Sequence, residues 1–261
     1  MSESISIVER GHGPLQIALI HGWAMTSDLF ATIADHFNDL ATLHLIDLPG
    51  HGRSRDCTTR IDTVDAVADE LASRIPANAV WLGWSMGGLF AQAAAQRAQA
   101  RGLIFVSSTP CFAAREDWTH GLKPSVLETM KQAVMTDARK TVNDFLQLEV
   151  LGTSRSHPSL DTIRQEAFGH GLPRTDALEQ GLQLLENADI RGEIASLRVP
   201  NLWIGGSRDR LVTPSTLHAA AQMNPHGRSE VLQGAGHAAF ISAPGDLNRH
   251  LENFAVDHGW L

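Results

Sequence analysis

Cysteine is scarce in this sequence of 261 residues. The two cysteines, Cys57 and Cys111, have neither paired spacing nor the neighbouring histidines of a metal site. A small disulfide scaffold needs several cysteines, and a structural zinc site needs several cysteine or histidine ligands close together. The sequence therefore predicts neither, and we expect the function to require no metal ion and no cofactor.

Positive charge and long apolar runs are also missing. The chain has 21 Lys and Arg against 29 Asp and Glu, a net charge of −8, which disfavours a general nucleic-acid surface. No apolar run approaches the roughly 18 residues of a membrane span, and residues 1–10 carry acids instead of an apolar signal core. We expect no nucleic-acid or membrane partner, a cytoplasmic location and, without an unusual apolar repeat, a monomer.

Short apolar runs alternate with helical patterns through most of the chain. Apolar residues make up 43% of the sequence, enough for a sizeable core at this length. The alternation is typical of an α/β fold, with a mostly parallel central sheet and helices on both faces. The predicted strands are 16–20, 43–48, 80–82, 103–106, 201–204 and 229–232, and the predicted helices are 28–40, 63–75, 89–100, 214–223 and 245–256.

This alternation of strands and helices stops after residue 107 and resumes near residue 200. Residues 112–189 contain no strand-like run, and helical patterns occupy 123–135, 138–151, 160–168 and 176–187. We therefore predict one core built from residues 1–111 and 190–261, with residues 112–189 as a helical lid insertion.

A Gly-Trp-Ser-Met-Gly motif at residues 83–87 lies between a predicted strand and a predicted helix. In that context Gly-x-Ser-x-Gly indicates a serine on a sharp turn, with its hydroxyl above the end of a sheet. Glycines flank it because such tight backbone leaves little room for side chains. We therefore predict that Ser85 is a nucleophile.

A serine nucleophile needs a base, and the base needs an acid that orients it. Asp209 and His237 each follow a predicted strand, in the order Ser, Asp, His that is typical of α/β hydrolases. Two simpler interpretations stay open: a solvated Asp209 between two arginines, and a His237 in a surface turn. His21 ends an earlier strand, and we expect it to be structural.

Acyl transfer also needs donors for the developing oxyanion. The backbone N–H of Met86, directly after the nucleophile, is one candidate. The second is expected in the loop after the first apolar strand, at the N–H of Trp23.

Together these motifs resemble the α/β-hydrolase superfamily over nearly the whole chain. The shared segments include His-Gly-Trp at 21–23, Asp-Leu-Pro-Gly-His-Gly-Arg-Ser at 47–54 and Gly-His at 236–237. More narrowly, the sequence is similar to the pimeloyl-[acyl-carrier protein] methyl ester esterases of biotin synthesis. The segments behind this narrower resemblance are 82–89, 108–115, 144–148 and 236–242, of which Pro-Cys-Phe at 110–112 is the most specific.

The resemblance implies that a methyl ester at the far end of a carrier-bound pimeloyl chain is hydrolysed to the acid and methanol. It also implies which residues surround the ester and the acyl chain: Trp23, Ser85, Met86, Phe145, Leu146, Gln147, Leu148, Glu149 and His237. Glu149 stands where the resemblance would place a glutamine.

The implied partner, acyl carrier protein, is acidic, so the insertion should offer it positive charge. Residues 112–189 instead hold 8 basic and 12 acidic residues. Lys140 matches an expected basic position, whereas Asp144, His157 and Asp161 stand where the resemblance would place arginines. Arg139, Arg155 and Arg164 lie nearby in the sequence and could substitute, although all four basic residues could equally be solvated helix charges.

Three other functions remain open at this point. The same triad would serve a broad carboxylesterase of small free esters or a carbon–carbon bond hydrolase or lyase, because one fold hosts many chemistries. A non-catalytic receptor of the same fold could use the pocket only to bind a ligand.

Overall fold

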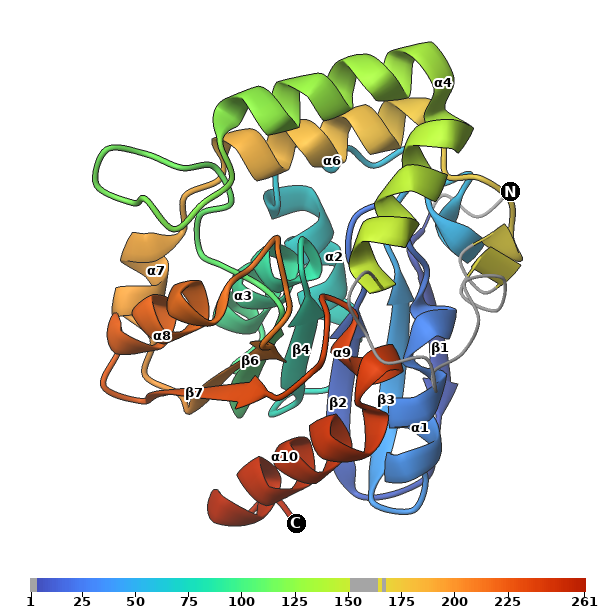
Figure 1. The fold of residues 1–261 in the computed structure, drawn as a ribbon. Helices are drawn as coiled ribbons and strands as arrows, with labels where there is room; N and C mark the ends of the chain where they lie inside the picture. The colour runs from blue at the N-terminus through green and yellow to red at the C-terminus, as the bar shows by residue number, and fades with distance from the viewer. Residues whose placement is uncertain (1–3, 151–163, 166–167) are drawn as a thin grey trace.

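The computed structural model describes residues 4–150, 164–165 and 168–261. Within these ranges a seven-stranded sheet forms the centre, in the order β1-β3-β2-β4-β5-β6-β7 (Figure 1). Only β1 runs antiparallel to its neighbour among the described strands, so the predicted mostly parallel sheet is confirmed. The strands are β1 (Ser6–Arg10), β2 (Leu15–Ile20), β3 (Ala41–Asp47), β4 (Val80–Trp84), β5 (Gly102–Val106), β6 (Asn201–Gly206) and β7 (Gly227–Leu232).

Strand β1 was not predicted from the sequence. It pairs with β3 from Ser6 opposite Asp47 to Arg10 opposite Leu43, at the edge of the sheet. Its residues are half-buried or exposed, because an edge strand packs less of its surface. A strand of this kind lacks the continuous apolar run that identifies the buried parallel strands.

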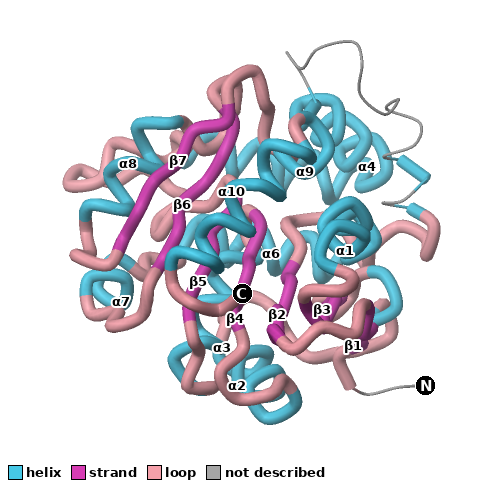
Figure 2. Tube along the Cα trace, turned by 90° about the horizontal axis from the view of Figure 1, so that it is seen from below, coloured by secondary structure: helices cyan, strands magenta, loops and turns pink. Residues whose placement is uncertain are grey.

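Helices cover both faces of the sheet, as the alternation predicts (Figure 2). On one face α3 (Gly87–Arg97) packs on β2, β4 and β5 and carries α2 (Asp65–Arg74). On the other face α1 (Ala31–Phe37) contacts β3 and α10 (Pro244–Asp257). Helix α8 (Pro214–Gln222) packs on β6 and β7. The short elements are η1 (Ser27–Phe30), η2 (Gly52–Ser54), α7 (Arg191–Ala195) and α9 (Ala239–Ser242).

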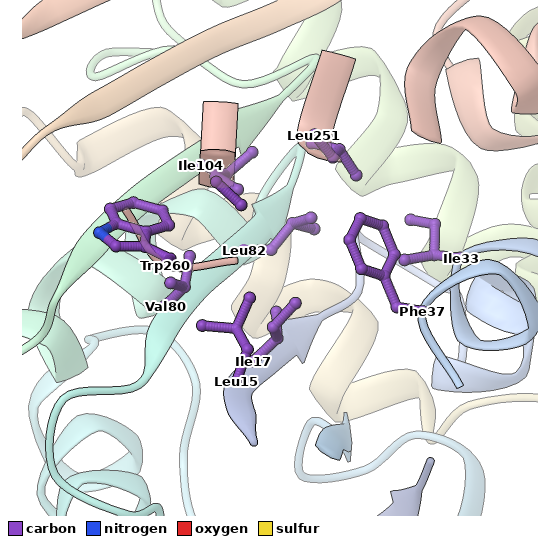
Figure 3. Close-up of a pocket in the computed structure, with 10 residues that line it drawn as sticks. Leu15, Ile17, Ile33, Phe37, Val80, Leu82, Ile104, Leu251 and Trp260 are labelled. Carbon is purple, nitrogen blue, oxygen red and sulfur yellow. The ribbon is translucent and has the colours of Figure 1, made fainter. Parts of the chain in front are cut away.

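A small apolar cavity of about 10 Å³ lies between the sheet and the α1 and α10 side (Figure 3). Leu82 and Ile104 come from the sheet, Phe37 from α1 and Leu251 from α10, and Trp260 closes another side. A space of this size holds about one water molecule, and an apolar lining offers that water no partner. The cavity is therefore a packing defect of the core and not a ligand pocket.

Two long helices, α4 (Pro124–Val150) and α6 (Thr175–Asn187), pack on each other above the sheet in Figure 1. Helix α4 is interrupted at Asp137, whose φ of −154° and ψ of 91° are not helical. This break falls between the two helices predicted at 123–135 and 138–151. The helix predicted at 160–168 lies mostly outside the described residues, and the division of the chain into core and insertion stays a prediction.

Candidate active site

Ser85 occupies the sharp turn between β4 and α3. Its φ is +52°, a left-handed conformation that a side chain other than glycine adopts only at a cost. The glycines of the motif permit this turn: a Cβ at Gly83 would lie 2.4 Å from the Gly87 carbonyl oxygen, and one at Gly87 would lie 2.2 Å from that of Ile20. The sequence therefore predicts the local geometry of this turn correctly.

Asp209 and His237 meet beyond the ends of β6 and β7. The Asp209 Oδ2 atom lies 2.8 Å from His237 Nδ1, while Oδ1 accepts the backbone N–H groups of Leu211 at 2.8 Å and Val212 at 2.9 Å. Asp209 is 5% exposed and His237 is 2% exposed. Both simpler interpretations, a solvated aspartate and a histidine in a surface turn, are therefore wrong.

Trp84 connects this pair to the serine turn. Its indole Nε1 donates a hydrogen bond of 3.2 Å to the carbonyl oxygen of His237, and the two rings lie 5.8 Å apart between centroids. Because Trp84 directly precedes Ser85, the histidine and serine segments are held next to each other. The structure thus brings together Ser85, Asp209 and His237, which lie on three separate loops.

The loop after β2 lies beside the same serine. A Cβ on Gly22 would be 3.1 Å from Ser85 Cβ, and the loop turns sharply at Ala24, whose φ is +63°. Trp23 lies within this turn. Met86 is the N-cap of α3, so its backbone N–H has no intrahelical acceptor. Both predicted oxyanion donors therefore belong to segments that border Ser85.

The comparisons with known proteins agree with this geometry. Residues 17–244 match the family model described as the alpha/beta hydrolase fold. The chain belongs to the α/β-hydrolase family. Solved structures of an esterase from Exiguobacterium antarcticum (TM-score 0.85, 18% identity, 96% of this chain and 94% of that one) and a bromoperoxidase from Bacillus anthracis (TM-score 0.86, 19% identity, 96% and 94%) share its fold.

Closer relatives come from the curated proteins. A protein from Stenotrophomonas maltophilia (strain R551-3) is 42% identical over 247 residues, covering 94% of each chain. One from Xylella fastidiosa (strain 9a5c) is 41% identical over 247 residues, covering 94% of this chain and 96% of its own. Both are named pimeloyl-[acyl-carrier protein] methyl ester esterase. Within the α/β-hydrolase family, the chain belongs with these esterases.

Part of the predicted acyl-chain site is assembled around Trp23. The rings of Trp23 and Phe145 meet edge to face with centroids 5.0 Å apart, and the indole Nε1 donates to the Leu178 carbonyl oxygen at 2.8 Å. A Cβ on Gly181 would lie 2.8 Å from the Trp23 ring and 3.1 Å from Met86 Sδ. Helix α6 therefore covers both predicted oxyanion residues, a contact that no sequence pattern predicted.

The predicted acyl-chain residues 145–149 lie on the second half of α4. Leu146 is buried and Gln147 is exposed, whereas the side chains of Leu148 and Glu149 lie outside the described part of the structure. A pocket of about 500 Å³ at the bend of α4 has both Phe145 and Lys140 in its lining. This pocket therefore adjoins one predicted acyl-chain residue and one predicted carrier-docking residue.

Three of the four predicted docking residues lie near one another. Arg139 and Lys140 are exposed on α4, and Arg164 Nε donates to Asn143 Oδ1 at 3.1 Å. Asn143 is one helical turn from Arg139, so these side chains share a face. Lys140 Nζ also pairs with Asp144 Oδ2 at 2.5 Å. Arg155 lies outside the described residues.

His21 is structural, as expected. Its Nδ1 lies 2.8 Å from the Gly22 carbonyl oxygen, and its Nε2 accepts the Leu48 N–H at 2.9 Å. An accepting Nε2 requires a neutral ring, and burial lowers the pKa of His21 accordingly. His21 therefore fixes the loop that carries Trp23.

The described ranges contain neither a metal-binding cluster nor a membrane-spanning helix. No three His, Cys, Asp or Glu side chains converge there in a way that could hold a metal ion. Among the same residues, no helix is both long and apolar enough to cross a bilayer.

Proposed function

We propose that this chain is a serine carboxylesterase that hydrolyses the methyl ester of pimeloyl-[acyl-carrier protein] to the free acid and methanol. The observation that carries the proposal is the buried Asp209–His237 pair beside the strained turn of Ser85. The names of the relatives supply the substrate.

The reaction would proceed in two acyl-transfer steps. His237 Nε2 removes the proton of Ser85 Oγ as this oxygen attacks the ester carbonyl, and Asp209 holds the other ring nitrogen. The N–H groups of Met86 and Trp23 stabilise the oxyanion of the tetrahedral intermediate. His237 then returns the proton to the departing methoxide, and a water molecule hydrolyses the acyl-enzyme by the same route.

The walls of the acyl site would come from Trp23, Met86, Phe145 and Leu146, which are all buried apolar residues. An acyl chain gains free energy by leaving water for such surfaces. The contacts of Gln147, Leu148 and Glu149 with the acyl chain stay expectations from the resemblance.

The experiment that tests the substrate compares pimeloyl-carrier methyl ester with free dimethyl pimelate, with methanol or acid release followed by mass spectrometry. We expect kcat/KM to be at least about tenfold higher for the carrier-bound ester, because the carrier adds contacts that the small diester lacks. Equal or higher kcat/KM with the free diester would favour the broad carboxylesterase instead.

Charge changes on α4 test where the carrier docks. We expect reversal of Arg139 and Lys140 to glutamate to raise KM for the carrier-bound ester about tenfold, because an acidic partner would then be repelled. The free diester should be hydrolysed as before. The opposite change, Asp144→Arg, removes the acid that pairs with Lys140 and should lower KM for the carrier substrate. If neither change is selective for the carrier substrate, docking occurs elsewhere.

The acidic carrier partner, a monomeric state and a cytoplasmic location stay predictions from the sequence. So do the carbon–carbon hydrolase or lyase and the non-catalytic receptor as alternative functions. Ester turnover that is lost in Ser85→Ala separates an enzyme from a non-catalytic receptor.

A further inference from the structure

We propose that Ser108 is a positioning residue that orients the backbone N–H of Met86 toward the oxyanion; this inference rests on the proposed esterase function. Ser108 lies two residues beyond the end of β5 and is 1% exposed. Its Oγ donates a hydrogen bond of 2.8 Å to the carbonyl oxygen of Ser85. The bond therefore reaches the backbone of the nucleophile and leaves the Ser85 hydroxyl out of the contact.

The carbonyl of Ser85 and the N–H of Met86 belong to one peptide unit. That unit is planar and trans, so the N–H points opposite to the C=O. Fixing the direction of the oxygen consequently fixes the direction of the N–H. A hydrogen bond accepted by the carbonyl also polarises the unit and strengthens its N–H as a donor. Ser108 thus orients the N–H of Met86 by binding the carbonyl oxygen on the opposite side of the same peptide unit.

The turn needs this support because it is strained. A left-handed backbone at a residue other than glycine costs of order 1–3 kcal/mol and persists only when neighbours hold it. The Ser85 N–H donates to Val106 at 2.9 Å, and its carbonyl accepts the Gly88 N–H at 3.0 Å. Ser108 adds a side-chain hydrogen bond to these two backbone hydrogen bonds. Together with Val106, it holds the backbone of Ser85 from the end of β5.

Gly88 provides the space for this contact. A Cβ at Gly88 would lie 2.2 Å from Ser108 Oγ and 2.9 Å from Ser108 Cβ. Any larger residue in the first turn of α3 would displace the hydroxyl. The second glycine after the nucleophile therefore serves the Ser108 contact.

The test compares Ser108→Ala with Ser107→Ala, using p-nitrophenyl butyrate as substrate. Ser107 is a matched control, because its hydroxyl is equally buried but has no hydrogen-bond partner among the described residues. Removing a whole oxyanion donor lowers kcat by about 10²–10³. We expect Ser108→Ala, which only misorients the donor, to lower kcat by between about 10-fold and 100-fold. KM should stay within about twofold, because the oxyanion forms only after binding.

A second measurement reports on the oxyanion directly. A trifluoromethyl ketone adds to Ser85 Oγ and places a negative oxygen among the same donors. Its inhibition constant should rise by the factor by which kcat/KM falls in Ser108→Ala, and stay unchanged in Ser107→Ala. Ser108→Cys, whose thiol is a weaker donor, should give an intermediate loss and provides a second variant if the alanine protein does not fold.

Two results would overturn the inference: kcat within twofold of the parent in Ser108→Ala or Ser108→Cys, or an equal loss in Ser107→Ala. The Ser85→Ala protein separates this failure from that of the proposed function. Turnover that survives in Ser85→Ala would contradict the esterase mechanism itself. An inactive Ser85→Ala beside a fully active Ser108→Ala would contradict only the role of Ser108.

Discussion

Replacement of Ser85 by alanine is expected to lower kcat for ester hydrolysis by about 10⁵-fold or more, since removal of a serine nucleophile disables the whole triad. The proposed chemistry needs the Ser85 hydroxyl because no covalent acyl-enzyme can form without it. Alanine tolerates the left-handed backbone at this position no worse than serine does, so the turn should keep its shape. Hydrolysis of p-nitrophenyl butyrate by the purified protein measures the effect.

A folding control accompanies that measurement. The thermal unfolding midpoints of Ser85→Ala and the parent protein should agree closely, because the nearly buried hydroxyl is replaced by a smaller group without a new polar atom. Activity above about 1% of the parent value in Ser85→Ala would contradict the nucleophile assignment. A parent protein that binds esters without hydrolysing them would favour the receptor.

The convergence of Ser85, Asp209 and His237 could be predicted from the sequence because each of them follows a parallel strand. Ser85 follows β4, Asp209 follows β6 and His237 follows β7, and the carboxyl ends of parallel strands share one edge of a sheet. Strand order within the sheet did not have to be known for this conclusion. The residues of the Gly-Trp-Ser-Met-Gly motif are consecutive in the sequence, so their spacing predicts the local backbone turn directly.

Other parts of the site could not be predicted in this way. The contact between Trp23 and Leu178 joins residues that are 155 positions apart, and helical periodicity in α6 predicts only that one face is buried. The hydrogen bond from Trp84 to His237 likewise depends on how two loops meet. Ser108 did carry one usable signal, because it follows β5 and therefore lies at the same sheet edge as Ser85.

The Asp209→Asn substitution provides the second large expected effect. In the parent protein Oδ1 of Asp209 accepts two backbone N–H groups and Oδ2 faces His237 Nδ1. Asparagine has one oxygen and one NH₂ group. The N–H groups of Leu211 and Val212 need an acceptor, so the asparagine oxygen faces them. The NH₂ group then faces His237.

That arrangement changes the tautomer of His237. An NH₂ donor opposite Nδ1 requires Nδ1 to accept, so the ring proton moves to Nε2, the atom that must remove the proton from Ser85. We expect kcat to fall by roughly 10⁴-fold at neutral pH, while KM changes little because the shape of the site is kept. Steady-state kinetics with p-nitrophenyl butyrate measure both constants. If Asp209 served only to pack the loop, this nearly isosteric change would leave kcat intact, so retention of a tenth of the parent kcat would contradict its orienting role.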